Sequence, residues 1–327
     1  MTQNLLTIED LRTYFYTEDG IVKAVDGVDL QILSGSIVGL VGESGSGKSV
    51  TALSIVRLIE RPGRIVSGRV MLDGRDLLAL SQDEMRRARG KEISMIFQDP
   101  MTSLNPVYTI QDQMEEPLIL HRNMTKHEAR AEVLEMLRKV RIPDPDKVAR
   151  LYPHELSGGM RQRVMIAMAL SCKPKLLIAD EPTTSLDVTL EAEILDLMKN
   201  LVREVGASVL LITHDIGIVA ETCDSAAVMY AGNVVESADV GELFANAKHP
   251  YTTALLNSIV NPRRRKQRLA VISGTVPNML HPPDGCRFHP RCPYATEKCA
   301  KATSERTLVS PTHSVACSLH DQDVKAN

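Results

Sequence analysis

The stretch that decides the fold is Gly42-Glu43-Ser44-Gly45-Ser46-Gly47-Lys48-Ser49. It fits the pattern G-x-x-x-x-G-K-[ST], in which a glycine-rich loop joins a buried strand to a helix. The apolar run 37–41 precedes the loop, and apolar residues at helical spacing follow it over 50–58. This is the strand–loop–helix context that the pattern requires, and it argues against a chance glycine-rich turn.

The residue types of the loop predict phosphate binding. Gly42, Gly45 and Gly47 permit backbone shapes that a Cβ would block, so their N–H groups can point at phosphate oxygens. The following helix adds the positive end of its dipole. Lys48 supplies a mobile charge for the β- and γ-phosphates, and Ser49 supplies a hydroxyl for Mg²⁺. The loop therefore predicts ATP and Mg²⁺ as ligands.

The bulk composition is that of an ordinary soluble protein. The chain has 327 residues and a net charge of −3, with 24% charged and 43% hydrophobic residues. This length allows two or more domains, and the charge gives no overall basic bias towards nucleic acid. No apolar run approaches the length of a membrane span, and the N-terminus lacks a basic, then apolar, signal segment. We therefore expect a cytosolic location, where disulfides are rare.

The pattern along the chain indicates how the elements are ordered. Apolar and polar residues alternate over 5–35, which favours half-buried antiparallel strands. The pattern becomes helical over about 99–160. Later buried strands each follow a helical segment, which predicts a mostly parallel sheet; they are 176–179, 209–212 and 226–230. After about residue 248 prolines become frequent and a basic run, 263–266, appears, which predicts a loop-rich C-terminal extension.

Polar residues follow the ends of several apolar strands. Asp180 ends one strand and can reach Mg²⁺ beside the phosphate loop, and Glu181 comes next and can polarise the attacking water. Gln98 follows the strand at 93–97 and can touch Mg²⁺ or water. His214 follows the strand at 209–212 and can bond the γ-phosphate. Each residue alone is weak evidence, but their shared position past a strand argues against coincidence.

A second anion cradle is predicted at Leu156-Ser157-Gly158-Gly159-Met160. It precedes an apolar helix, so its N–H groups and the helix dipole suit an anion. One nucleotide does not need two such cradles from one chain, and the residues alone do not explain the second.

With these motifs in order, residues of about 5–250 resemble the ATP-binding-cassette (ABC) ATPases. Ser185-Leu186-Asp187 matches the family's D-loop, and Met160 stands where the family usually has Gln. The resemblance implies an α/β fold: a RecA-like P-loop core, an antiparallel β subdomain, a helical signature subdomain (about 99–160) and the C-terminal extension. It implies a dimer in which Ser157, Gly158 and Gly159 cover the partner's nucleotide. Phe15, rather than Tyr16, would stack on adenine.

The tail resembles that of oligopeptide and dipeptide importer ATPases, through His249-Pro250-Tyr251-Thr252 and the cysteines beyond it. The resemblance implies an extension over 251–320 and a peripheral position on the cytoplasmic face of the membrane. It implies a second, non-identical ATPase, two permease subunits and an external binding protein as partners, with 101–106 near the permeases. Importers of nickel chelates, opines or glutathione share this tail, so the cargo stays open.

The cysteines of the tail follow the spacing C-x5-C-x6-C-x17-C, at Cys286, Cys292, Cys299 and Cys317. Four thiolates can hold a 4Fe–4S cluster or Zn²⁺, and the spacing alone does not decide between them. The family resemblance favours the cluster. Free structural cysteines and a redox sensor are the other interpretations. Cys172 and Cys223 lie beside apolar segments and are interpreted as buried fillers.

A rival from another class is a soluble ABC ATPase that acts on ribosomes or DNA. Such proteins usually carry two cassettes or a long coiled-coil insertion. This chain has one cassette and about 60 residues between Gln98 and the signature, which favours the importer.

Overall fold

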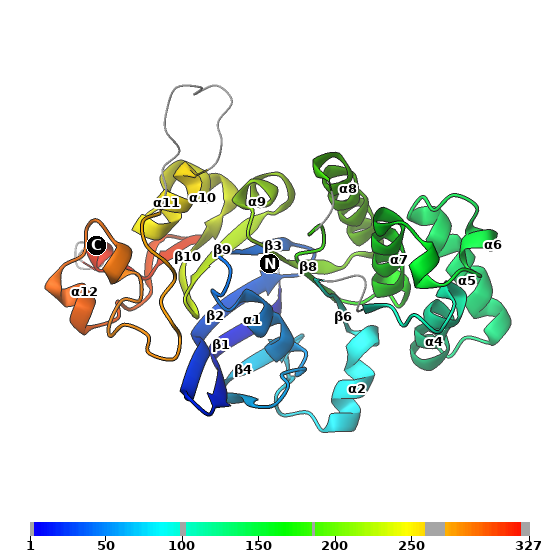
Figure 1. Cartoon of the computed structure of the whole chain (residues 1–327), viewed down its shortest axis with the longest axis horizontal. Helices are drawn as coiled ribbons and strands as arrows, with labels where there is room; N and C mark the ends of the chain where they lie inside the picture. Colours follow the sequence, from blue (N-terminus) through cyan, green and yellow to red (C-terminus); the bar gives the residue numbers. More distant parts are fainter. Residues whose placement is uncertain (1–2, 99–102, 185–186, 259–271, 322–327) are drawn as a thin grey trace. The chain divides into compact units, whose positions relative to one another are not determined.

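The computed structural model describes residues 3–98, 103–184, 187–258 and 272–321. The basic run 263–266, Met101, Thr102, Ser185 and Leu186 lie outside the described residues. The chain forms two compact units (Figure 1). Unit 1 comprises Met1–Leu5, Ile32–Ser36 and Ala79–Ile212, and unit 2 comprises Leu6–Gln31, Ile37–Leu78 and Thr213–Asn327.

Unit 1 contains parallel strands in the order β8-β7-β6, all largely buried. The strands are β6 (Ile93–Ile96), β7 (Leu176–Asp180) and β8 (Ser208–Thr213). Helices α7 (Gly158–Ser171) and α8 (Val188–Val205) connect them in the chain. The predicted parallel strands are thus confirmed, and parallel strands end at one edge, which gathers the residues that follow them.

Most of the remaining helices of unit 1 lie in the stretch of about 99–160 that the sequence predicted to be helical, whereas the helix over 82–91 precedes it. Helices α4 and α5 pack against each other and against α7 (Figure 1). Thr125 begins α5 with a capping box, in which it and Glu128 satisfy each other's backbone N–H groups. The bounds are α2 (Gln82–Lys91), α4 (Ile110–Arg122), α5 (Lys126–Lys139), α6 (Pro145–Val148) and the 3₁₀ turn η1 (Pro153–Glu155).

Unit 2 contains the predicted antiparallel sheet, in the order β2-β1-β4-β5. Its strands are β1 (Asn4–Thr17), β2 (Gly20–Leu33), β4 (Gly63–Leu72) and β5 (Arg75–Asp76). Leu6 and Ile8 are buried with the period of two of a strand, and a register shift between Glu9 and Arg12 makes Leu11 the next buried residue.

A second set of strands in unit 2 runs in the order β11-β12-β10-β9-β3. The buried strand β3 (Ile37–Val41) pairs in parallel with β9 (Ser225–Tyr230) and leads into α1 (Lys48–Ile55). A hairpin joins β9 to β10 (Asn233–Asp239). Helices α9 (Ile216–Thr222), α10 (Val240–Asn246) and α11 (Pro250–Asn257) complete this part.

The extension shares its packing with the strands that precede it. Strands β11 (Thr307–Ser310) and β12 (His313–Val315) continue the antiparallel pairing from β10. His313 on β12 bonds Glu236 on β10 at 2.7 Å, and both side chains are fully buried. The short helix α12 (Glu297–Lys301) and the 3₁₀ turns η3 (His289–Arg291) and η4 (Ser318–His320) lie around the cysteines.

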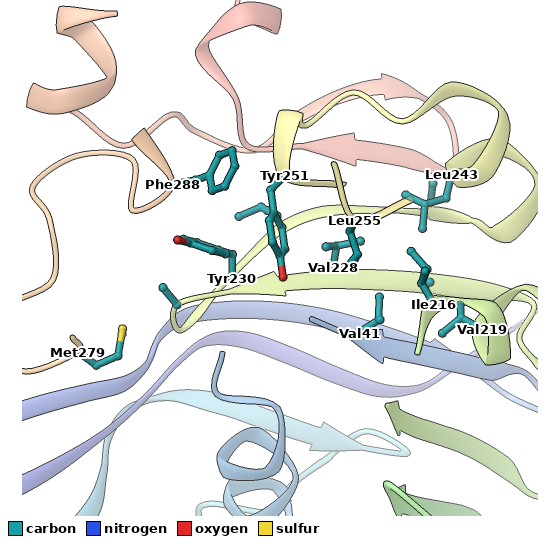
Figure 2. Close-up of a cluster of buried hydrophobic side chains, with 14 residues drawn as sticks. Val41, Ile216, Val219, Val228, Tyr230, Leu243, Tyr251, Leu255, Met279 and Phe288 are labelled. Carbon is teal, nitrogen blue, oxygen red and sulfur yellow. The ribbon is translucent and has the colours of Figure 1, made fainter. Parts of the chain in front are cut away.

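An aromatic cluster joins the extension to β9 and α11 (Figure 2). The ring of Phe288 lies 5.1 Å from that of Tyr230 and 5.4 Å from that of Tyr251. Burying one such ring contributes about 2 kcal/mol. The loop-rich character of the tail was predicted correctly, but the tail packs into a shared core, and a domain boundary near residue 250 stays a prediction.

Candidate functional site

The predicted phosphate loop lies in unit 2 between β3 and α1. Gly47 caps α1 in the left-handed conformation, with φ 104°. A Cβ on Gly42 would lie 2.1 Å from the carbonyl oxygen of Met229, so only glycine fits there. The buried Lys48 donates from Nζ to the carbonyl oxygens of Gly42 at 2.7 Å and Glu43 at 3.1 Å. Its ammonium group is thus held over the loop.

The loop also contains a buried hydroxyl that fits a polar ligand. Ser46 Oγ is buried and has no hydrogen-bond partner among the residues that the structure describes. A hydroxyl in this state costs free energy unless a ligand or water satisfies it. Together with the N–H groups at the start of α1, the arrangement fits the phosphates of a nucleotide.

Unit 1 brings Gln98 and Glu181 together. Glu181 follows β7, and its N–H donates to the carbonyl oxygen of Ile212 at 2.9 Å. Gln98 Nε2 and Thr184 Oγ1 each donate to Glu181 Oε2 at 3.0 Å. Glu181 also has a φ of 45°, an unfavourable conformation for a residue with a Cβ. The site thus holds this carboxylate in a fixed position at a conformational cost.

Asp180 is the last residue of β7 and is buried. A carboxylate at this point offers the hard oxygen that Mg²⁺ prefers. Sequence reasoning found Asp180 and Glu181 from their position after an apolar strand, but it missed Thr184. The hydroxyl of Thr184 has no signal of its own in the sequence, because threonine is common in loops.

Two further predicted nucleotide contacts, Phe15 and His214, lie in unit 2. His214 follows β8 and is exposed. Phe15 lies on β1 opposite Gly63, and the neighbouring Tyr16 is exposed under the guanidinium of Arg64, 5.5 Å from its ring centre. Phe15 is half-buried, and the roles of Phe15 and His214 in nucleotide binding remain predictions.

The signature residues form an open cradle at the start of α7. Ser157 caps the helix, and its Oγ accepts from the N–H of Met160 at 3.3 Å. A cavity of about 410 Å³ lies over this end. Its lining includes Gly158, Gly159 and Asp187, the last residue of the D-loop motif. The cradle is therefore accessible from outside unit 1.

The four tail cysteines gather in one place. Each of the six possible pairs among Cys286, Cys292, Cys299 and Cys317 interacts electrostatically. The N–H of Cys286 donates to the carbonyl oxygen of Cys299 at 2.8 Å. Gly285, with φ 65°, makes this approach possible, because a Cβ there would lie 2.4 Å from the same oxygen. Cys172 has other partners, and its Sγ donates to the carbonyl oxygen of Pro117 at 3.5 Å.

The thiols have different protonation tendencies. Burial, followed by the neighbouring thiols, raises the pKa of Cys317 to about 11. Burial alone would also raise the pKa of Cys299, but hydrogen bonds from Ser318 and Thr296 lower it overall. In the described part of the chain, no three His, Cys, Asp or Glu side chains are arranged as metal ligands. The four thiols are the kind of ligand that iron–sulfur clusters and zinc prefer, but they are not arranged in a metal-binding geometry.

Comparisons with known proteins agree with these features. The profile described as "ABC transporter" matches residues 25–184. A solved dimeric structure of the ATP-binding cassette MJ0796 bound to ADP and Pi, in a post-hydrolysis state, superposes with a TM-score of 0.65 and 30% identity. The match covers 72% of this chain and 98% of that one. Fold and loop together define an ABC ATPase, which hydrolyses ATP.

The curated relatives define the family more closely. The chain is 52% identical to a probable peptide ABC transporter ATP-binding protein of Sinorhizobium fredii, over 96% of this chain and 94% of that one. It is 49% identical to the oligopeptide transport ATP-binding protein AppD of Bacillus subtilis, over 98% of both. The profile "Oligopeptide/dipeptide transporter, C-terminal region" matches residues 235–299. The chain belongs to the family of ATP-binding subunits of oligopeptide/dipeptide ABC transporters. Within the residues described, none of the helices is long and apolar enough to cross a membrane.

Proposed function

We propose that the chain is the energy-coupling ATPase of a bacterial importer of di- or oligopeptides. It would lie on the cytoplasmic face of the membrane, paired with a second homologous ATPase and two permeases. An external binding protein would deliver the cargo. The names of the relatives and the match to the transporter C-terminal region support this proposal. Nickel-chelate, opine and glutathione importers are the alternatives for the cargo.

The position of Glu181 is the observation that carries the ATPase mechanism. Two donors, Gln98 and Thr184, hold its Oε2, and its backbone is strained where it follows β7. A carboxylate held in this way can orient a water molecule and accept its proton as that water attacks the γ-phosphate. Through its hydrogen bond to Glu181, Gln98 would link the nucleotide site to movement of the helical region that follows it in the chain.

The remaining groups would bind the nucleotide. Glycines and serines of the loop 42–49 would donate N–H and O–H groups to phosphate oxygens, and Lys48 would move from the loop carbonyls to the phosphates. Ser49, Asp180 and Gln98 would hold Mg²⁺, which neutralises phosphate charge. Phe15 would stack on adenine and His214 would bond the γ-phosphate.

Glu181→Gln tests this mechanism, because it keeps the shape of the side chain and removes its charge. We expect nucleotide binding to be retained and turnover to fall about 100-fold or more, as for loss of a positioned general base. In proteoliposomes with the permeases, ATP-driven peptide uptake should fall to the same extent. Near wild-type hydrolysis would contradict the role of Glu181. If the wild-type complex hydrolyses ATP but takes up no peptide, the proposal that its cargo is a di- or oligopeptide is wrong.

The segment after Gln98 is the proposed contact with the permeases. Beside its described residues 103–106, Val107 is 71% exposed and Tyr108 is 54% exposed. Neighbouring exposed apolar side chains are typical of a protein interface. The exposure of these two residues supports a permease contact there.

We further infer that Cys286, Cys292, Cys299 and Cys317 hold a 4Fe–4S cluster, with zinc as the alternative. Their mutual proximity and thiol chemistry support it. Such a centre would supply folding free energy to a tail of short elements. Protein purified without air should contain about four iron atoms and four sulfides per chain. Serine in place of any of the four should abolish this content, whereas Cys172→Ser and Cys223→Ser should not. One zinc per chain would mean that the four cysteines form a zinc site. Protein that contains neither iron nor zinc would overturn the inference.

A further inference from the structure

Glu43, the second residue of the phosphate loop, is held by the C-terminal extension. Its carboxylate accepts from Arg291 Nη1 at 2.7 Å and Nη2 at 3.1 Å. Its backbone N–H donates to the hydroxyl oxygen of Tyr251 at 3.0 Å. The Arg291 side chain is only 5% exposed, and that of Glu43 is 28% exposed. Two-point contact of this kind is among the stronger polar interactions in proteins.

The extension orients Arg291 for this contact. Its Nε donates to the carbonyl oxygen of Ser273 at 2.9 Å, and its guanidinium carbon lies 5.7 Å from the ring centre of Tyr230. The Tyr230 hydroxyl accepts from Nη1 at 3.3 Å. The hydrogen bond to Glu43 raises the pKa of Arg291 above its usual range. The guanidinium is therefore fixed in place as a permanent positive charge.

Glu43 is in turn connected to the groups that would meet phosphate. Its carbonyl oxygen accepts from Lys48 Nζ at 3.1 Å and from the N–H of Ser46 at 3.2 Å. Its carboxylate belongs to the loop that would bind a polyphosphate. The negative carboxylate and the negative phosphates would repel each other. A cation that neutralises Glu43 removes this repulsion and fixes the loop at the same time.

We propose that Arg291 is a positioning residue of the nucleotide site, which neutralises Glu43 and holds the phosphate loop in its binding conformation. The inference rests on the proposed role of the loop 42–49. It extends the site to a residue of the tail, Arg291, which directly precedes Cys292 in the sequence. The tail is then part of the ATP-binding apparatus as well as of the fold.

The test is a double-mutant cycle on equilibrium binding of a fluorescent ATP analogue to the full chain. Arg291→Gln should weaken binding about tenfold, as for loss of one charge-assisted interaction. Arg291→Lys, which keeps the charge and loses the two-point contact, should recover binding to within about threefold of wild type. In a Glu43→Gln background, Arg291→Gln should change the affinity less than about twofold, because no carboxylate is left to neutralise.

Arg287→Gln is the matched control. Arg287 also joins the extension to the preceding strands, through Asp26 and the carbonyl oxygen of Ala231, and its side chain is 9% exposed. Its hydrogen bonds in the described part of the chain are with Asp26 and Ala231, neither of which belongs to the loop 42–49. Its loss should lower the thermal midpoint without changing nucleotide affinity. If Arg287→Gln weakens binding as much as Arg291→Gln does, the effect is general loosening of the tail, and the proposal is overturned.

Two further outcomes separate the possible failures. If Lys48→Ala does not change the affinity, the assignment of the loop itself is wrong. If Lys48→Ala abolishes binding but Arg291→Gln has the same effect with and without the Glu43 carboxylate, Arg291 does not act by neutralising Glu43. Should Arg291→Gln fail to fold, Arg291→Lys and Glu43→Gln still complete a cycle. In that cycle, Arg291→Lys should cost less when Glu43 is Gln, and an equal cost would overturn the proposal.

Discussion

The phosphate loop 42–49 and the signature cradle 157–160 both end in a helix N-terminus rich in glycine, yet they are built differently. The loop contains its own cation, Lys48, which is buried against the loop carbonyls. The cradle has an exposed Ser157 and an open cavity. Arg163, which lines this cavity, is paired with Glu193 at 3.1 Å. The loop can therefore meet a phosphate with its own cation, whereas the cradle offers N–H groups to a nucleotide held elsewhere.

This difference supports a composite site formed by two subunits. A helix N-terminus whose neighbouring cation is already paired contributes a modest interaction, which adds to the binding of a nucleotide that is held elsewhere. The similar ATP-binding cassette MJ0796, which is 30% identical to this chain, is a dimer in its solved structure. The phosphate loop and the signature cradle should thus respond differently to substitution. The loop should control nucleotide affinity in the single chain, and the signature cradle should control closure of the pair of subunits.

The largest effect on nucleotide affinity should follow Lys48→Ala. The substitution removes the loop's own cation, so we expect the dissociation constant for ATP to rise about 100-fold. Lys48→Arg serves as the control, because it keeps the charge and loses only the compact ammonium group. Equilibrium titration of the isolated chain measures both. Equal affinity in Lys48→Ala and wild type would make the loop no different from the cradle.

A smaller effect, at a different site, should follow Ser157→Arg. The bulky side chain fills the cradle, so turnover of the assembled pair should fall about tenfold, while affinity at this chain's own loop stays within about twofold. Ser157→Thr keeps the capping hydroxyl and is the control. Mixing the variant with a wild-type partner subunit should locate the defect at the partner's nucleotide. A defect at the variant's own loop would argue against a composite site.

The two cradles were predictable from the sequence because each is contiguous in the chain. The same holds for Asp180 and Glu181, which follow a strand recognisable from its apolar residues. The contact between Glu43 and Arg291 was not predictable, because the two residues are 248 positions apart and neither shows a periodic pattern. The short strands β11 and β12 were also missed, since their pairing depends on β10, about 75 residues earlier. The cysteines were recognised as a group by their density, but the role of Gly285 depends on geometry alone.

A third helix N-terminus, that of α11, is closed by its own side chain. His249 Nδ1 accepts from the N–H of Tyr251 at 3.1 Å, and its Nε2 is buried without a hydrogen-bond partner in the described residues. Burial, followed by the charge of His320, lowers the pKa of His249 to about 3. Protonation would place an unsatisfied charge in the core next to Tyr251, which also contacts Glu43.

The smallest predicted effect is therefore on pH dependence. The folded pKa of His249 is below the unfolded value of 6.5, so the unfolded chain binds more protons between about pH 3 and 6.5. Stability should be intact above pH 6.5 and should fall as the pH is lowered through this window, by about 1.4 kcal/mol at pH 5.5. His249→Asn keeps a capping acceptor that does not titrate. Denaturant unfolding at pH 7.5 and 5.5 should show a smaller loss in this variant than in wild type. An equal loss of stability in both proteins would mean that protonation of His249 does not cause it, and that other groups in the chain account for the acid sensitivity.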